Sequence, residues 1–173
     1  GGGNMGKMKL ELDTFELIIA KDLEYEVITQ INYLDLKTGK ILILYEDDSE
    51  AEDNAGIEPA ENREKKNLVS TNSKRFLRLP VIPHLEHHQI LQDFLYSNWT
   101  DDKELQDKAL WNYNSSIGGW LKNIKDDPDI QDAWYVYKHN FIEKYTINFF
   151  RKSIKELELP IIEDNGEFFI LTP

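Results

Sequence analysis

Three histidines, His84, His87 and His88, lie within five residues of one another. If this segment is helical, His84 and His88 lie one turn apart on the same face, a spacing at which two imidazoles can bind one transition metal ion. Glu86 points elsewhere on such a helix, so no complete ligand set is visible. Two interpretations stay open: a metal site at His84 and His88, and solvated side chains in the first turn of a helix.

A second candidate binding group is Lys74, Phe76 and Arg78, in and beside a strand predicted over residues 75–79. Alternate residues of a strand share one face. An exposed Phe76 between two cations could stack a nucleobase or hold an acidic peptide. The alternative is that a helix covers this face, or that neighbouring acids pair with its cations.

Two tryptophans receive opposite predictions. Trp120 follows Gly118 and Gly119 and lies outside any strong apolar stripe, so we expect it to be exposed for contact with a partner. Trp134 belongs to a stripe at helical spacing and is predicted to lie in the core.

The segment from Glu46 to Glu64 holds nine acidic residues and one basic residue, Arg63, with few large apolar side chains. Such a segment buries too little apolar surface to order itself, so we predict a mobile acidic loop over residues 46–67. Its acids do not follow the spacing of a calcium-binding loop. Deletion of residues 47–61 is therefore expected to leave stability nearly unchanged.

The usual enzyme signatures are missing from the chain. There is no Gly-x-Ser-x-Gly elbow, phosphate-binding loop or dinucleotide fingerprint. The absence of cysteine excludes disulfides, thiolate metal sites and a cysteine nucleophile. These observations favour a non-catalytic protein, and no cofactor is predicted.

Composition limits the class of protein further. The chain has 173 residues, 40 % of them hydrophobic, which suits one domain with a sizeable core. A net charge of −12 disfavours binding to nucleic acid, and no apolar run approaches the length of a membrane span. Residues 1–9 are interpreted as a tag or a disordered start, and residues 10–173 as a single domain. Without a signal segment, we expect a cytoplasmic protein.

Periodicity predicts the elements that position these residues. The first helix begins near Asp13, and two strands from Ile28 to Tyr45 are joined at Lys37-Thr38-Gly39. Ile41 to Tyr45 is apolar on both faces, so this strand is predicted to lie in the middle of the sheet. Three shorter helices are predicted to precede a long one that opens at Asp127-Pro128-Asp129, and a hairpin is predicted over residues 160–171.

The order of several motifs resembles a small uncharacterised bacterial protein family, the uncharacterised protein family numbered 0158. The motifs are Tyr33 to Gly39, an acidic insert, Arg75 to Pro80, Asp93-Phe94 and Trp134 to Lys138, and the similarity covers residues 28–157. The resemblance implies a one-domain bacterial cytoplasmic protein with no assigned activity.

The sequence thus predicts an α+β fold: a small antiparallel sheet of about three strands, packed with an N-terminal helix and a C-terminal helical array that ends in one long helix. The favoured function is a non-catalytic protein-interaction module, which binds through a groove between sheet and helices or through the acidic segment. One alternative is a metal-assisted hydrolase using His84 and His88. Another is a binder of single-stranded nucleic acid through Lys74, Phe76 and Arg78.

Overall fold

The computed structural model describes residues 6–20 and 30–173, which form six strands and seven helices. The strands are β1 (Gly6–Leu10), β2 (Gln30–Asp35), β3 (Ile41–Tyr45), β4 (Phe76–Arg78), β5 (Ile161–Asp164) and β6 (Glu167–Thr172). The helices are α1 (Leu12–Ile19), α2 (Asp48–Ala55), α3 (Pro59–Thr71), α4 (His84–Leu95), α5 (Lys103–Trp111), α6 (Ile117–Asn123) and α7 (Pro128–Leu157). The predicted α+β class is confirmed.

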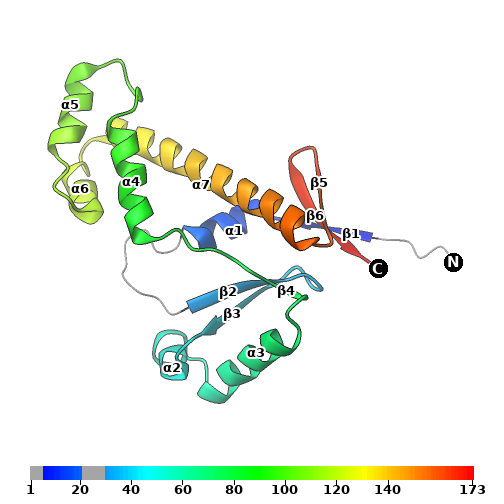
Figure 1. The fold of residues 1–173 in the computed structure, drawn as a ribbon. Coiled ribbons are helices and arrows are strands. Elements are labelled where there is room, and N and C mark those ends of the chain that lie inside the picture. Colours follow the sequence, from blue (N-terminus) through cyan, green and yellow to red (C-terminus); the bar gives the residue numbers. More distant parts are fainter. Residues whose placement is uncertain (1–5, 21–29) are drawn as a thin grey trace.

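The strands form two antiparallel sheets of three strands, in the orders β3-β2-β4 and β1-β6-β5. Helix α7 extends from the group α4, α5 and α6 toward the β1-β6-β5 sheet, and the β3-β2-β4 sheet lies below it in Figure 1 with α2 and α3 beyond. Strands β5 and β6 form the predicted terminal hairpin. Residues 6–9, interpreted from the sequence as part of a tag or a disordered start, are ordered, because Gly6 to Leu10 pairs with β6. Residues 1–5 and 21–29 lie outside the described residues, and the predicted start of the first strand at Ile28 falls among them.

The tight turn between β2 and β3 is built by side chains within the turn itself. The Asp35 carboxylate accepts hydrogen bonds from the Lys37 amide at 2.9 Å and from the Thr38 hydroxyl at 3.0 Å. Gly39 has a φ of 73°, a conformation that glycine adopts without steric cost. The hairpin predicted at this position is confirmed, with Leu34 opposite Ile41 next to the turn.

The predicted place of β3 was wrong, because β2 is the central strand and β3 lies at an edge. Leu44 and Tyr45 are buried whereas Ile43 is exposed, and α3 covers the outer edge of the strand. Asn62 of α3 bonds the backbone of Tyr45, and the Lys65 ammonium donates to the Ile43 carbonyl at 3.1 Å.

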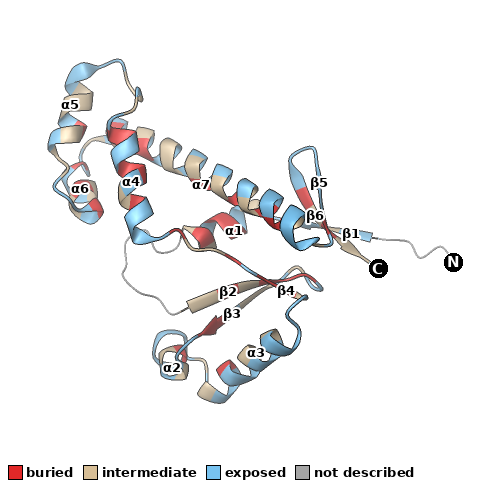
Figure 2. Cartoon of the chain, viewed as in Figure 1, coloured by how far each residue is buried: buried red, intermediate tan, exposed pale blue. Residues whose placement is uncertain are grey.

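The predicted acidic loop over 46–67 was also wrong, because this segment contains α2 and most of α3. The Asp47 side chain caps α2 by accepting a hydrogen bond from the Ser49 amide. Gly56 ends that helix in the left-handed conformation, and Pro59 occupies the first turn of α3. Most side chains of both helices are exposed (Figure 2), so their position depends on a few specific contacts.

Aromatic side chains from α4, the loop after it, α6 and α7 form one part of the core. Phe94 of α4 stacks on Trp99 with ring centroids 5.1 Å apart, and it contacts Trp134 of α7 at 5.4 Å. Trp120 of α6 meets Trp134 edge-to-face at 5.7 Å. The predicted burial of Trp134 is confirmed, and the long helix predicted from Asp127 is α7.

Candidate functional site

A groove of about 670 Å³ lies between α1 and α7. The two helices are held together beside it by Phe15, which meets Phe150 edge-to-face with ring centroids 5.2 Å apart. The groove is lined by Asp13, Glu16, Leu17 and Ala20 from the α1 segment and by Tyr135, Lys138, His139 and Ile142 from α7. On both helices the lining residues follow the spacing i, i+3, i+4, i+7 of a single face.

The two walls of this groove carry exposed apolar side chains. Leu17 on α1 is 76 % exposed, and Tyr135 on α7 is 65 % exposed. The Tyr135 ring lies nearly parallel to the His139 imidazole, with centroids 6.1 Å apart. Exposed large apolar groups at a concave site are typical of surfaces that bind another molecule.

The groove also holds a carboxylate with an altered affinity for protons. Glu16 is only 8 % exposed, and its burial raises the pKa of its carboxyl above the usual value. The nearby His139 opposes this shift, whereas Asp13 adds to it. No hydrogen bond joins Glu16 to His139 within the described part of the chain, so the pair lacks the direct contact expected of an assembled acid–base couple. A cation placed in the groove would stabilise the Glu16 carboxylate.

The structure brings the two predicted metal ligands together. On α4 the Nε2 atoms of His84 and His88 are 3.2 Å apart, and the Nδ1 atom of His88 lies 3.3 Å from the Tyr113 hydroxyl. Among residues 6–20 and 30–173, no group of three or more His, Cys, Asp or Glu side chains could hold a metal ion. The hydrolase alternative therefore has two imidazole ligands in place and no third protein ligand in this part of the chain.

His87 occupies a different environment from its two neighbours. It is fully buried, and neither of its ring nitrogens makes a hydrogen bond of good geometry. Burial lowers the pKa of His87 to about 4; the Ile82 backbone opposes this more weakly, while Lys138, His84 and His88 add to the lowering. The interpretation of the three histidines as solvated first-turn side chains is therefore wrong for His87, whose place in the stripe His87, Ile90, Leu91 and Phe94 is a signal of burial.

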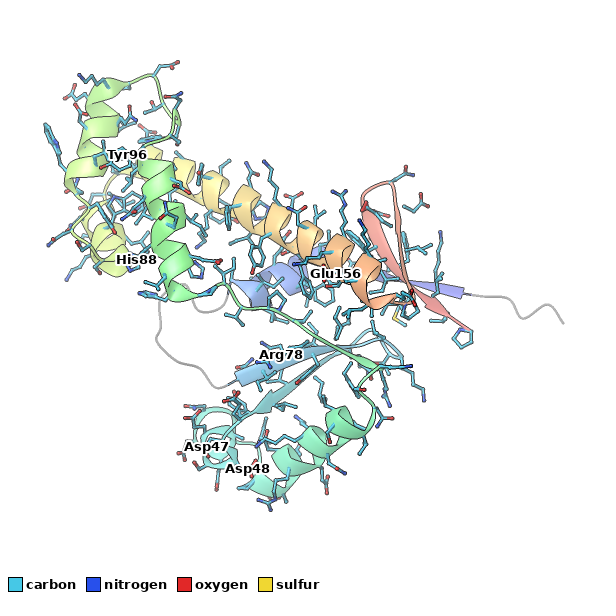
Figure 3. The ribbon with its side chains drawn as sticks, in the orientation of Figure 1. Asp47, Asp48, Arg78, His88, Tyr96 and Glu156 are labelled. Carbon is cyan, nitrogen blue, oxygen red and sulfur yellow. The ribbon has the colours of Figure 1, made fainter. Side chains whose placement is uncertain are left out.

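The predicted binding strand does not present an aromatic platform. Phe76 is only 7 % exposed, with the Arg75 guanidinium 5.0 Å from its ring centre and Tyr33 against its edge. Arg75 also donates two hydrogen bonds to the buried Asp35 carboxylate, at 2.9 and 2.8 Å. Lys74 and Arg78 are exposed (Figure 3 shows Arg78), but the ring that would stack a nucleobase is covered.

The expected exposure of Trp120 was wrong. This side chain is fully buried, and its indole Nε1 donates to the Ala109 carbonyl at 2.9 Å. The glycines that precede it belong to α6, whose Ser116 side chain caps the helix. The exposed tryptophan is instead Trp111, at the end of α5.

The acids of α2 lie far from the histidines of α4, as Figure 3 shows for Asp47, Asp48 and His88. Asp48 has its own partners in α3: it accepts from the Asn62 amide at 2.7 Å and from the Lys66 ammonium at 3.1 Å. These hydrogen bonds lower the pKa of Asp48. Its part in the structure is to fasten α2 to α3.

A comparison with protein-family models, curated proteins and solved structures finds no match to this chain. None of the helices in the described ranges combines the length and the apolar composition needed to cross a bilayer.

Proposed function

We propose that this protein is a non-catalytic interaction module that binds a short segment of another protein in the groove between α1 and α7. The observation that carries the proposal is the pair Leu17 and Tyr135, two exposed apolar side chains on opposite walls of one groove. Large apolar anchors in a concave site contribute most of the free energy of binding in protein interfaces. This groove lies between two helices, not between sheet and helices as the sequence suggested.

The acidic side chains of α1, which line the groove opposite Lys138 and His139 of α7, indicate the chemistry of the partner. Glu16 is a carboxylate that burial has partly removed from water, and Asp13 lies on the same face of α1. A lysine or arginine from a partner would compensate the cost of this burial. The net charge of −12 also favours association with a basic partner. We therefore expect a segment with one large apolar side chain and at least one cation.

A role for α2 and α3 as a second contact surface remains part of the proposal. Their acids would attract the same basic partner over a distance comparable with the screening length, about 8 Å at physiological salt.

Selection from a random peptide library tests the proposal. Peptides that bind the wild-type protein are expected to carry Lys or Arg beside a large apolar residue. Tyr135→Ala should weaken their binding by about tenfold. Glu16→Gln should weaken binding and reduce its dependence on salt concentration, because the carboxylate that meets the cation is removed.

Tyr96→Ala is the matched control, because Tyr96 is another exposed tyrosine, at the end of α4 (Figure 3), and does not line the groove. It should leave peptide binding unchanged. Selected peptides that lack basic residues, or that bind Tyr135→Ala as tightly as the wild type, would contradict the proposal.

A further inference from the structure

The contact between His84 and His88 has the dimensions of a metal-binding pair. Their rings are nearly perpendicular, at 88°, and approach through the two Nε2 atoms, which are 3.2 Å apart. Zinc bonds imidazole nitrogen at roughly 2.0 to 2.1 Å, so two nitrogens at a tetrahedral angle lie about 3.3 Å apart. The separation of the two nitrogens therefore matches that of two imidazole ligands of one zinc ion.

Tyr113 adds a support for one of the two ligands. Its hydroxyl lies 3.3 Å from Nδ1 of His88, the nitrogen on the far side of the ring from His84. When the Nδ1–H group donates to this hydroxyl, the lone pair of Nε2 is left free for a metal. The contact thus provides an acceptor for the tautomer of His88 that coordination through Nε2 requires.

The surroundings allow a metal ion to reach the pair from solvent. His84 is exposed and His88 is half-buried, whereas His87 between them is enclosed in the core. With no third His, Cys, Asp or Glu ligand available from the described ranges, the remaining coordination positions face water. The ligand set is two neutral imidazoles, which suits Zn²⁺, Ni²⁺ or Cu²⁺ and does not suit Mg²⁺ or Ca²⁺.

We propose that His84 and His88 form an open site for a divalent transition metal ion such as Zn²⁺, with Tyr113 as a positioning residue. The site is independent of the groove between α1 and α7. It binds one ion per chain through two protein nitrogens, and water completes the coordination. Because protons compete for the same nitrogens, its affinity falls on acidification.

Calorimetric titration of the full chain with Zn²⁺ in a non-chelating buffer tests the site. We expect one ion per chain, no binding of Mg²⁺, and a loss of affinity of at least about tenfold in His84→Ala and in His88→Ala, since each removes one of two protein ligands. Tyr113→Phe should weaken binding by a smaller factor, up to about tenfold. His139→Ala is the matched control, because His139 also has a possible ligand at i+4, Glu143, but should leave zinc binding unchanged.

Ring ¹⁵N chemical shifts of the wild-type protein provide a second readout that needs no variant. Zinc should shift Nε2 of His84 and His88 and leave both ring nitrogens of His87 in place. Unchanged affinity in the doubly substituted His84→Ala, His88→Ala protein would overturn the proposal. So would ring shifts of His84 and His88 that do not move at a zinc concentration saturating the calorimetric signal.

Discussion

The side chain of Asn62 pairs with the backbone of Tyr45 as a neighbouring strand would. Its Oδ1 atom accepts from the Tyr45 amide at 2.9 Å, and its Nδ2 group donates to the Tyr45 carbonyl at 2.8 Å. Asn62 is fully buried, and its second amide proton is used by Asp48 at 2.7 Å. Asn62 of α3 thereby supplies hydrogen-bond partners to the backbone at the edge of the sheet and attaches α2 and α3 to it.

Asn62→Ala is expected to lower the free energy of unfolding by roughly 1 to 3 kcal/mol, because it leaves a buried amide and a buried carbonyl without partners. Asn67→Ala on the exposed side of the same helix should change it by less than about 0.5 kcal/mol. Urea unfolding of both variants measures the difference. Equal stability of the two variants would show that Asn62 does not hold α3 on the sheet.

Deletion of residues 47–61 is now expected to destabilise the protein, in contrast to the expectation from sequence. The deletion removes Asp48 and the fully buried Ala51, and it takes away the start of α3, the helix that carries Asn62. Thermal unfolding followed by circular dichroism should show a clear fall in melting temperature. An unchanged melting temperature would restore the interpretation of this segment as a dispensable loop.

His87 is expected to make stability depend on pH. Its pKa is about 4 in the folded protein and about 6.5 when unfolded, so the unfolded chain binds more protons between these values. The contribution of His87 to the free energy of unfolding is fully present above about pH 6.5. It decreases by roughly 3 kcal/mol in total as the pH falls toward 4. The pKa of His87 is also lowered by the charges of Lys138 on α7 and of His84 and His88 on its own helix.

His87→Leu should remove the contribution of His87 to the pH dependence of stability, while it keeps an apolar side chain in the core. The difference in unfolding free energy between variant and wild type, measured by urea titration at several pH values, should grow in favour of the variant on acidification. A constant difference from pH 7 to pH 4 would contradict the assignment.

Asp35 is expected to control stability at lower pH. The Arg75 guanidinium is the main cause that lowers the pKa of Asp35 to about 2, and the Lys37 amide and Thr38 hydroxyl assist it. A lowered carboxyl pKa stabilises the fold above pH 4, and this contribution, roughly 2 kcal/mol, is lost as the pH falls from 4 toward 2. Asp35→Asn should remove that dependence, and Asp53→Asn, at an exposed position of α2, should keep it.

Trp134→Ala is expected to cost roughly 3 to 5 kcal/mol, because it removes a buried indole from the aromatic cluster and leaves a cavity. The indole is 5 % exposed and contacts both Phe94 and Trp120. Trp111→Ala should cost less than about 0.5 kcal/mol, since Trp111 is 83 % exposed. Denaturant unfolding of the two variants compares the same substitution in core and surface positions.

The sequence by itself determined those parts of the structure that depend on neighbours in the chain. The i, i+3, i+4 stripe that contains Trp134 predicted α7, and the turn at Lys37 to Gly39 predicted the β2–β3 hairpin. The signal for each element lies within a few residues, because helical and strand periodicity and turn chemistry are local properties. The α+β class followed from the order of these elements.

Only the tertiary structure decided which side chains are covered and which meet. Trp120 is buried because the Ala109 carbonyl and the ring of Trp134 reach it from other helices. The acidic segment is ordered because Asn62 finds the backbone of Tyr45, 17 residues earlier in the chain. The groove exists because α1 packs on α7, more than one hundred residues later in the sequence. Such contacts depend on how separate elements pack, and the spacing of residues within one element does not contain that information.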